Sequence, residues 1–136
     1  MVISNEPIHC RQDFSWVRDN ETSRQELLNF AEQAGGELPD WLKQDSTLQQ
    51  QFLDILTADL KIAESISSEQ IKPLDGIPML VIYGEDDPLL STPPSRWKEC
   101  TTGQCYIESI LGKHFITSTH GKEIYELIKQ FAISTI

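Results

Sequence analysis

The chain has 136 residues, of which 39% are hydrophobic, and this length suits a single domain. A formal net charge of −10, with the 11 basic residues scattered singly, excludes nucleic acids and anionic membrane surfaces as expected partners. No apolar run approaches the roughly 20 residues that cross a bilayer. The first residues lack the basic and apolar regions of a signal peptide, so we expect a soluble, cytoplasmic protein.

The three cysteines, Cys10, Cys100 and Cys105, form no Cys-x-x-Cys motif. Their odd number and wide spacing are typical of free thiols in a reducing compartment. His9 stands beside Cys10, but no second pair of metal ligands accompanies them, so we expect neither a metal nor a cofactor.

In chain order, the first predicted element is a short strand at residues 2–4, and residues 9–20 are predicted to form a loop. Ser23 and Glu26 then have the spacing of a capping box, which predicts the start of a helix. The apolar residues that follow recur with a helical period, and Gly35-Gly36 is expected to end the helix.

The section after these glycines is also predicted to be helical. A short helical turn is expected near Pro39. Apolar residues then recur at spacings of three and four between residues 48 and 66, which predicts a longer helix. Pro73 and Gly76 follow that helix and are typical of its end.

The last 60 residues follow a different pattern. Residues 79–83 are predicted to form a buried strand, and Pro93-Pro94 permits a short helix after it. A second strand is expected at residues 104–109, followed by an amphipathic helix at about residues 119–131. Alternation of strand and helix predicts a parallel α/β unit, so the helical section before it is expected to be an insertion.

Two residues that could act in acid–base catalysis follow the predicted strands of this unit. Asp87 lies in Gly-Glu-Asp-Asp-Pro after the strand 79–83, and His114 lies in Gly-Lys-His-Phe after the strand 104–109. Functional groups gather at the carboxyl ends of parallel strands, where an acid can orient a histidine that acts as general base. The same residues also fit a simple turn and a surface histidine, which is the alternative interpretation.

These motifs together resemble the carboxyl-terminal part of the α/β-hydrolase thioesterases. More narrowly, they resemble the type II, stand-alone thioesterases of non-ribosomal peptide and polyketide synthesis. The resemblance rests on residues 78–88, Trp97-Lys98, Thr101-Thr102-Gly103 and residues 112–115, with support from Ile3-Ser4, Pro7, Gly35-Gly36, Leu38-Pro39 and residues 55–60.

The resemblance implies a truncated α/β-hydrolase fold, in which a short parallel sheet carries a helical lid. The chain would form a single partial domain. Residues 1–19 would hold the first strand and loop, residues 20–75 the lid, and residues 76–136 the strand–helix–strand–helix unit with the acid and the histidine.

By the same resemblance, Asp87 rather than Asp86 is the acid of a catalytic triad and His114 is its base. The implied activity is hydrolysis of acyl or peptidyl thioesters carried on phosphopantetheine by carrier proteins, which would be the partners. The implied lid and substrate-binding residues are Phe52, Leu56, Asp59 and Phe115. Departures from the family pattern at Thr57, at Ile66 or a neighbour, and at Lys113 concern substrate contacts rather than the fold.

The nucleophile of such an enzyme is missing from the sequence. None of the twelve serines lies in a Gly-x-Ser-x-Gly motif. Without a nucleophile no acyl-enzyme can form, so we expect hydrolysis only together with a nucleophile-bearing half. The alternatives are a non-catalytic binding or oligomerisation module, and a cysteine hydrolase that pairs Cys10 or Cys105 with His114.

The strand at residues 2–4 would be left with an open edge, because the nucleophile-bearing strand would pair there in the complete family fold. Unpaired backbone groups at a sheet edge favour association. We therefore expect a homo-oligomer, a swapped assembly or a partner chain.

Overall fold

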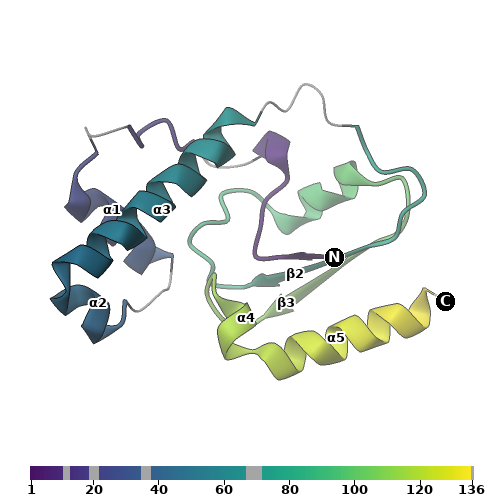
Figure 1. Ribbon diagram of the computed structural model, residues 1–136. Coiled ribbons are helices and arrows are strands. Elements are labelled where there is room, and N and C mark those ends of the chain that lie inside the picture. Colours follow the sequence, from purple (N-terminus) through teal and green to yellow (C-terminus); the bar gives the residue numbers. More distant parts are fainter. Residues whose placement is uncertain (11–12, 19–21, 35–37, 67–71, 136) are drawn as a thin grey trace.

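The computed structural model describes residues 1–10, 13–18, 22–34, 38–66 and 72–135. A three-stranded parallel sheet in the order β1-β2-β3 forms its centre (Figure 1). The strands are β1 (Val2–Ile3), β2 (Met79–Gly84) and β3 (Cys105–Ile110). Val2 pairs with Val81, and Met79 pairs with Cys105. The predicted parallel α/β fold is therefore confirmed, with strand ends that differ by one residue from those expected.

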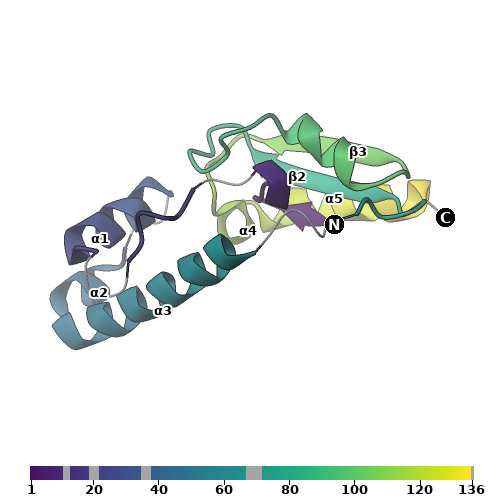
Figure 2. The ribbon, with the colours of Figure 1, turned by 90° about the horizontal axis from the view of Figure 1, so that it is seen from above.

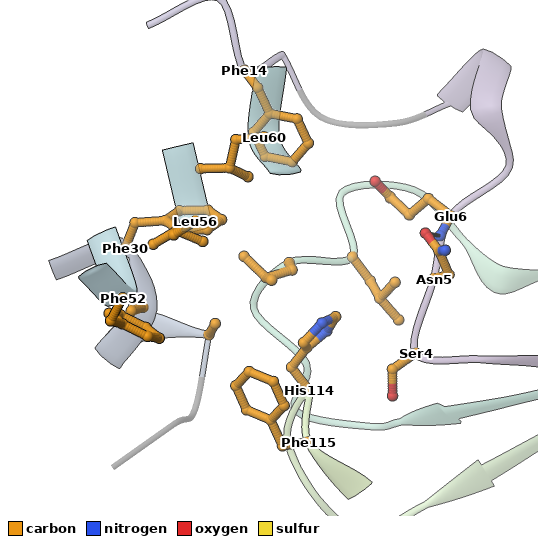
Figure 3. Close-up of a pocket in the computed structure, with 14 residues that line it drawn as sticks. Ser4, Asn5, Glu6, Phe14, Phe30, Phe52, Leu56, Leu60, His114 and Phe115 are labelled. Atoms are coloured by element: carbon orange, nitrogen blue, oxygen red, sulfur yellow. Dashed lines mark hydrogen bonds between the residues drawn. The ribbon is translucent and has the colours of Figure 1, made fainter. Parts of the chain in front are cut away.

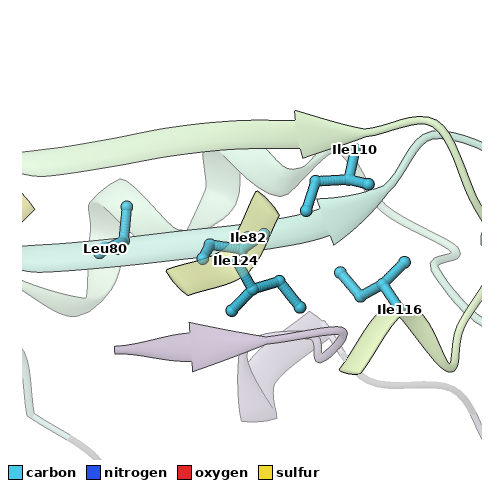
Figure 4. Packing of buried hydrophobic residues seen from close by; sticks show 5 residues of the cluster. All are labelled: Leu80, Ile82, Ile110, Ile116 and Ile124. Atoms are coloured by element: carbon cyan, nitrogen blue, oxygen red, sulfur yellow. The ribbon is translucent and has the colours of Figure 1, made fainter. Parts of the chain in front are cut away.

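The middle strand is buried because its side chains are apolar on both faces of the sheet. Leu80 and Ile82 have 1% and 0% of their surface exposed. They form a core with residues of β3, α4 (Ile116–Thr119) and α5 (Gly121–Ser134), as Figure 4 shows. The 3₁₀ helix η3 (Pro94–Cys100) also packs against β2 and β3.

The helices between residues 24 and 65 form a separate layer beyond the carboxyl ends of the strands (Figure 2). Both α1 (Arg24–Gln33) and α2 (Asp40–Gln44) pack against α3 (Ser46–Ser65). The capping box is present at the start of α1, where the hydroxyl of Ser23 accepts the N–H of Glu26 at 3.1 Å. One core cluster joins α1, α3 and the segment before α1, namely Val17, Leu27, Leu53 and Leu60, and a second cluster joins α1 and α2, namely Ala31, Leu38 and Leu42.

Two details differ from the sequence predictions. Residues 8–10 form a 3₁₀ turn, η1 (Ile8–Cys10), where a loop was expected from residue 9. The expected helix at about 119–131 is present as α5, and a short helix that was not expected, α4, precedes it; His120, with φ −127° and ψ 33°, separates the two helices. Gly35-Gly36 lies outside the described residues. None of the described helices is long and apolar enough to cross a membrane.

Candidate active site

Asp87 and His114 meet at the carboxyl ends of β2 and β3. The Nδ1 atom of His114 lies 2.9 Å from Oδ2 of Asp87, whose side chain is completely buried. The other oxygen, Oδ1, accepts the backbone N–H of Leu89 at 2.9 Å. Since an ionised carboxylate only accepts hydrogen bonds, Nδ1 carries the proton in the neutral ring. The second ring nitrogen, Nε2, is then the atom that can accept a proton.

The close approach of the two strand ends depends on Gly84. The backbone N–H of Asp86 donates to the carbonyl of Gly112 at 3.0 Å, so the loops after β2 and β3 run together. A Cβ atom at Gly84 would overlap the carbonyl oxygens of Gly112 and Lys113. Only glycine leaves room for this backbone contact, which brings Asp87 within reach of His114.

A cavity of about 380 Å³ lies between this pair and the helical layer (Figure 3). His114 and Phe115 form one side of the cavity, and their rings meet edge to face with centroids 5.1 Å apart. The opposite side is apolar and consists of side chains from the helices and from the segment before α1, namely Phe14, Phe30, Ala31, Ala34, Phe52, Leu56 and Leu60. Its size and its apolar character fit a small-molecule site with few polar groups.

The structure places three of the four expected lid and substrate residues at this cavity. Phe52, Leu56 and Phe115 line it, whereas Asp59 is exposed and is not among its lining residues. The reason is helical geometry. Residues 52, 56 and 60 follow one another every four positions along one face of α3, and residue 59 lies beside that face.

Several lining residues were missed by sequence reasoning. The spacing of four from Phe52 and Leu56 could have identified Leu60. No sequence signal identified Phe14, because it lies in a predicted loop. Its backbone N–H donates to a carboxylate oxygen of Glu64 on α3 at 2.9 Å, and this long-range bond brings it to the cavity.

Ser4 is a second residue that the sequence did not single out. It has a φ of +48°, in the left-handed region that is costly for any residue except glycine. Its N–H donates to the carbonyl of Ile82 at 2.9 Å, which fixes this turn at the end of β1. Ser4 is among the residues that line the cavity, and its buried hydroxyl has no hydrogen-bond partner in the described part of the chain and points away from the ring of His114 (Figure 3).

The cysteines lie elsewhere. Among the described residues that line the cavity there is no cysteine. Burial raises the pKa of the Cys100 thiol and of the Cys105 thiol, so the reactive thiolate is disfavoured at both. These placements argue against a hydrolase that uses a cysteine with His114. The described residues also contain no cluster of three metal-ligating side chains.

No protein-family model and no curated protein matches the sequence. Several solved structures share its fold, and three of them are described below. The RedJ thioesterase from the prodiginine biosynthetic pathway in Streptomyces coelicolor has a TM-score of 0.75 and 24% identity, over 95% of this chain and 49% of that chain. BorB, the type II thioesterase from the borrelidin biosynthetic cluster, has a TM-score of 0.73 and 22% identity, over 95% of this chain and 51% of that chain. Human thioesterase 2 has a TM-score of 0.62 and 23% identity, over 97% of this chain and 56% of that chain.

At these identities the likeness shows the fold. The chain spans about half the length of the thioesterases that it matches. The short parallel sheet with helices beyond its carboxyl edge agrees with the expected truncated α/β-hydrolase. The chain therefore has the α/β-hydrolase fold of these thioesterases, over about half of their length.

Proposed function

We propose that this chain supplies the acid and the base of a thioester hydrolase. The observation that carries the proposal is the 2.9 Å contact between Asp87 and His114 beside an apolar cavity. With Nδ1 held by the buried aspartate, Nε2 of His114 accepts the proton of a nucleophile and later returns it to the leaving thiolate. Asp87 fixes the ring orientation and stabilises the imidazolium that forms in between.

The nucleophile, in this proposal, comes from a second segment that carries a Gly-x-Ser-x-Gly turn. The sequence contains no such turn, and the similar thioesterases are about twice as long. The outer edge of β1 is the place where that segment would join the sheet, because β1 pairs with β2 on one side and, within the described residues, with no strand on the other.

The substrate class follows from the cavity. Its apolar walls fit an acyl chain, and His114, the proposed base, lines the same cavity. We propose acyl or peptidyl thioesters on carrier proteins as substrates. The pathway origin of RedJ and the type II class of BorB support this choice.

The test starts with the coding sequence upstream of residue 1. A segment there that encodes Gly-x-Ser-x-Gly is expressed with this chain, and hydrolysis of octanoyl-pantetheine is measured. His114→Ala and Asp87→Asn are each expected to lower kcat on the order of 10⁴-fold. Asp86→Asn is the matched control, because Asp86 is an exposed carboxylate one position away, and it should leave the rate near that of the wild type.

Two results would contradict the proposal. One is a reconstituted complex without turnover. The other is turnover that His114→Ala does not change. Both would leave a binding module as the better interpretation.

The second candidate is a non-catalytic acyl-binding module. It is favoured by the cavity, which is formed by this chain alone, together with the missing nucleophile motif. This candidate predicts that the chain alone binds octanoyl-pantetheine saturably in a calorimetric titration and leaves it intact. Absence of binding to the isolated chain would dismiss it.

A further inference from the structure

Glu6 is a buried carboxylate that the proposed reaction does not use. The residue is 8% exposed and lines the cavity, near Asn5 in Figure 3. Its Oε1 atom accepts the backbone N–H groups of Ser91 at 2.6 Å and of Thr92 at 2.8 Å. It also accepts the hydroxyl of Ser91 at 3.0 Å and that of Thr92 at 3.1 Å. Four donors on one oxygen offset much of the cost of burying the charge.

These bonds connect distant parts of the chain. Glu6 follows β1, whereas Ser91 and Thr92 lie 85 and 86 residues later, in the segment between Asp87 and η3. The near end of that segment is held by Asp87, whose Oδ1 accepts the N–H of Leu89 at 2.9 Å. Its far end is held by Glu6. The segment is therefore fastened by one carboxylate at each end.

The segment affects two parts of the candidate site. Leu89 and Leu90 line the cavity between its two anchors. The N–H of Leu89 is also the donor that holds the Asp87 carboxylate on the side away from His114. If the far end moves, this donor moves with it, and both the orientation of Asp87 and the cavity wall change.

Glu6 itself is poorly suited to direct chemistry. The hydroxyl of Ser91 also lies 3.2 Å from Oε2, so its one proton is shared between the two carboxylate oxygens, and both oxygens face protein donors. A general acid or base needs an oxygen that can face the substrate. The contacts instead match a residue that acts through its neighbours.

We propose that Glu6 is a positioning residue, which fixes the segment 88–92 and thereby holds Asp87 toward His114 and keeps Leu89 and Leu90 in the cavity wall. The inference rests on the proposed function for its catalytic meaning. The coupling of Glu6 to the Asp87–His114 contact can be measured without an assay of catalytic activity.

The test follows the ring resonances of His114 by NMR in the labelled full chain, with His114→Ala to assign them. Glu6→Ala removes the acceptor and is expected to shift these resonances in the same direction as Asp87→Asn. Glu6→Gln is the conservative variant. Its carbonyl oxygen can replace Oε1 and accept the same N–H groups, so it should restore the wild-type resonances.

The amide resonances of β2 and β3 serve as the folding control. If Glu6→Ala keeps these amide resonances and leaves the ring of His114 unchanged, the inference is wrong. If Glu6→Ala does not fold, the double variant Ser91→Ala/Thr92→Ala removes only the two hydroxyl donors. A smaller shift of the His114 resonances is then expected, and no shift overturns the inference.

The same variants separate this inference from the proposed function. In a reconstituted hydrolase, Glu6→Ala should lower kcat on the order of 10²-fold, as for misplacement by about 1 Å, and Glu6→Gln should recover most of it. An inactive complex whose His114 ring still responds to Glu6→Ala contradicts the hydrolase proposal and supports the positioning role. An active complex that is insensitive to Glu6→Ala contradicts the positioning role alone.

Discussion

At the scale of single residues, the contact between Asp87 and His114 results from a close backbone approach. The loops after β2 and β3 share hydrogen bonds that start at Glu85, whose N–H donates to the carbonyl of Ile110 at 2.9 Å. Gly84 allows this approach because it has no Cβ atom. The geometry of the pair thus depends on a residue that takes no part in the chemistry.

Gly84→Ala is expected to lower the free energy of unfolding by about 1–3 kcal/mol, because a methyl group would overlap two backbone carbonyl oxygens that cannot rotate away. Urea denaturation measures the change. Gly121→Ala is the matched control, since a Cβ there meets nothing within 4 Å, and it should be neutral or stabilising. Equal effects of the two substitutions would show that the overlap at Gly84 is relieved by a local shift.

Ser4 offers a second prediction at this scale. Its buried hydroxyl lacks a partner within the described residues, and such a group costs about 1–3 kcal/mol. Ser4→Ala keeps the backbone conformation and removes only the oxygen. Thermal unfolding should therefore show equal or higher stability for Ser4→Ala. A loss of more than about 1 kcal/mol would mean that the hydroxyl is hydrogen-bonded in solution.

At the scale of elements, the helices α1 and α3 are fixed by different interactions at their ends and along their length. The start of α1 is a capping box, in which the backbone N–H of Ser23 donates to the Glu26 carboxylate at 2.9 Å. The start of α3 is capped by Asp45, which accepts the N–H groups of Thr47 and Leu48. Along their length the two helices are joined by buried leucines.

The capping box predicts that the stability of the protein depends on pH. The Ser23 backbone N–H, and then its hydroxyl, lower the pKa of Glu26 from its ordinary value of 4.5. A depressed folded-state pKa means that the stabilisation is present above about pH 4.5 and is lost as the pH falls through the folded-state pKa. Glu26→Gln keeps an acceptor for the Ser23 N–H but cannot titrate. The difference in Tm between wild type and Glu26→Gln should therefore shrink on acidification from pH 7 to pH 3, and a constant difference would contradict the prediction.

The two faces of α3 predict contrasting mutational effects. Leu60 is 7% exposed and packs in the helical core, so Leu60→Ala should cost about 2–5 kcal/mol. Asp59→Ala, one position away on the exposed surface, should change stability by less than about 0.5 kcal/mol. Chemical denaturation of the two variants measures both values. A large effect of Asp59→Ala would place that residue in an interface.

At the scale of the whole molecule, β1 lies at one edge of the sheet, and no strand within the described residues pairs with its outer side. In a parallel sheet, the backbone groups of successive residues point alternately to the strands on either side. The N–H of Ser4 donates to the carbonyl of Ile82 on β2, so the backbone groups of Ile3 point to the outer side of β1. Exposed strand edges promote pairing with another chain. The expected outcome is an oligomer in sedimentation velocity at micromolar concentration, and a single species of 15.5 kDa would contradict it.

The sequence by itself determined the local features of this protein. A continuous apolar run and an alternating run identified the two later strands, and the helical period with the capping box identified the helices. The alternation of strand and helix predicted the parallel arrangement of the last 60 residues. The motifs after two strands identified Asp87 and His114, because strand ends and polar residues are both visible in a linear pattern. The short helix α4 before His120 was not visible, since four residues are too few to give a periodic signal.

Only the tertiary structure decided which distant residues share the site. Phe14 reaches the cavity through a bond to Glu64, and Glu6 holds a segment that begins more than 80 residues later. Such contacts depend on how the helical layer and the loops pack against the sheet. The donors to a buried carboxylate can lie anywhere in the sequence, because the fold and not the sequence spacing brings them together. For this reason the pair at the strand ends was predictable, whereas the residues that position it were not.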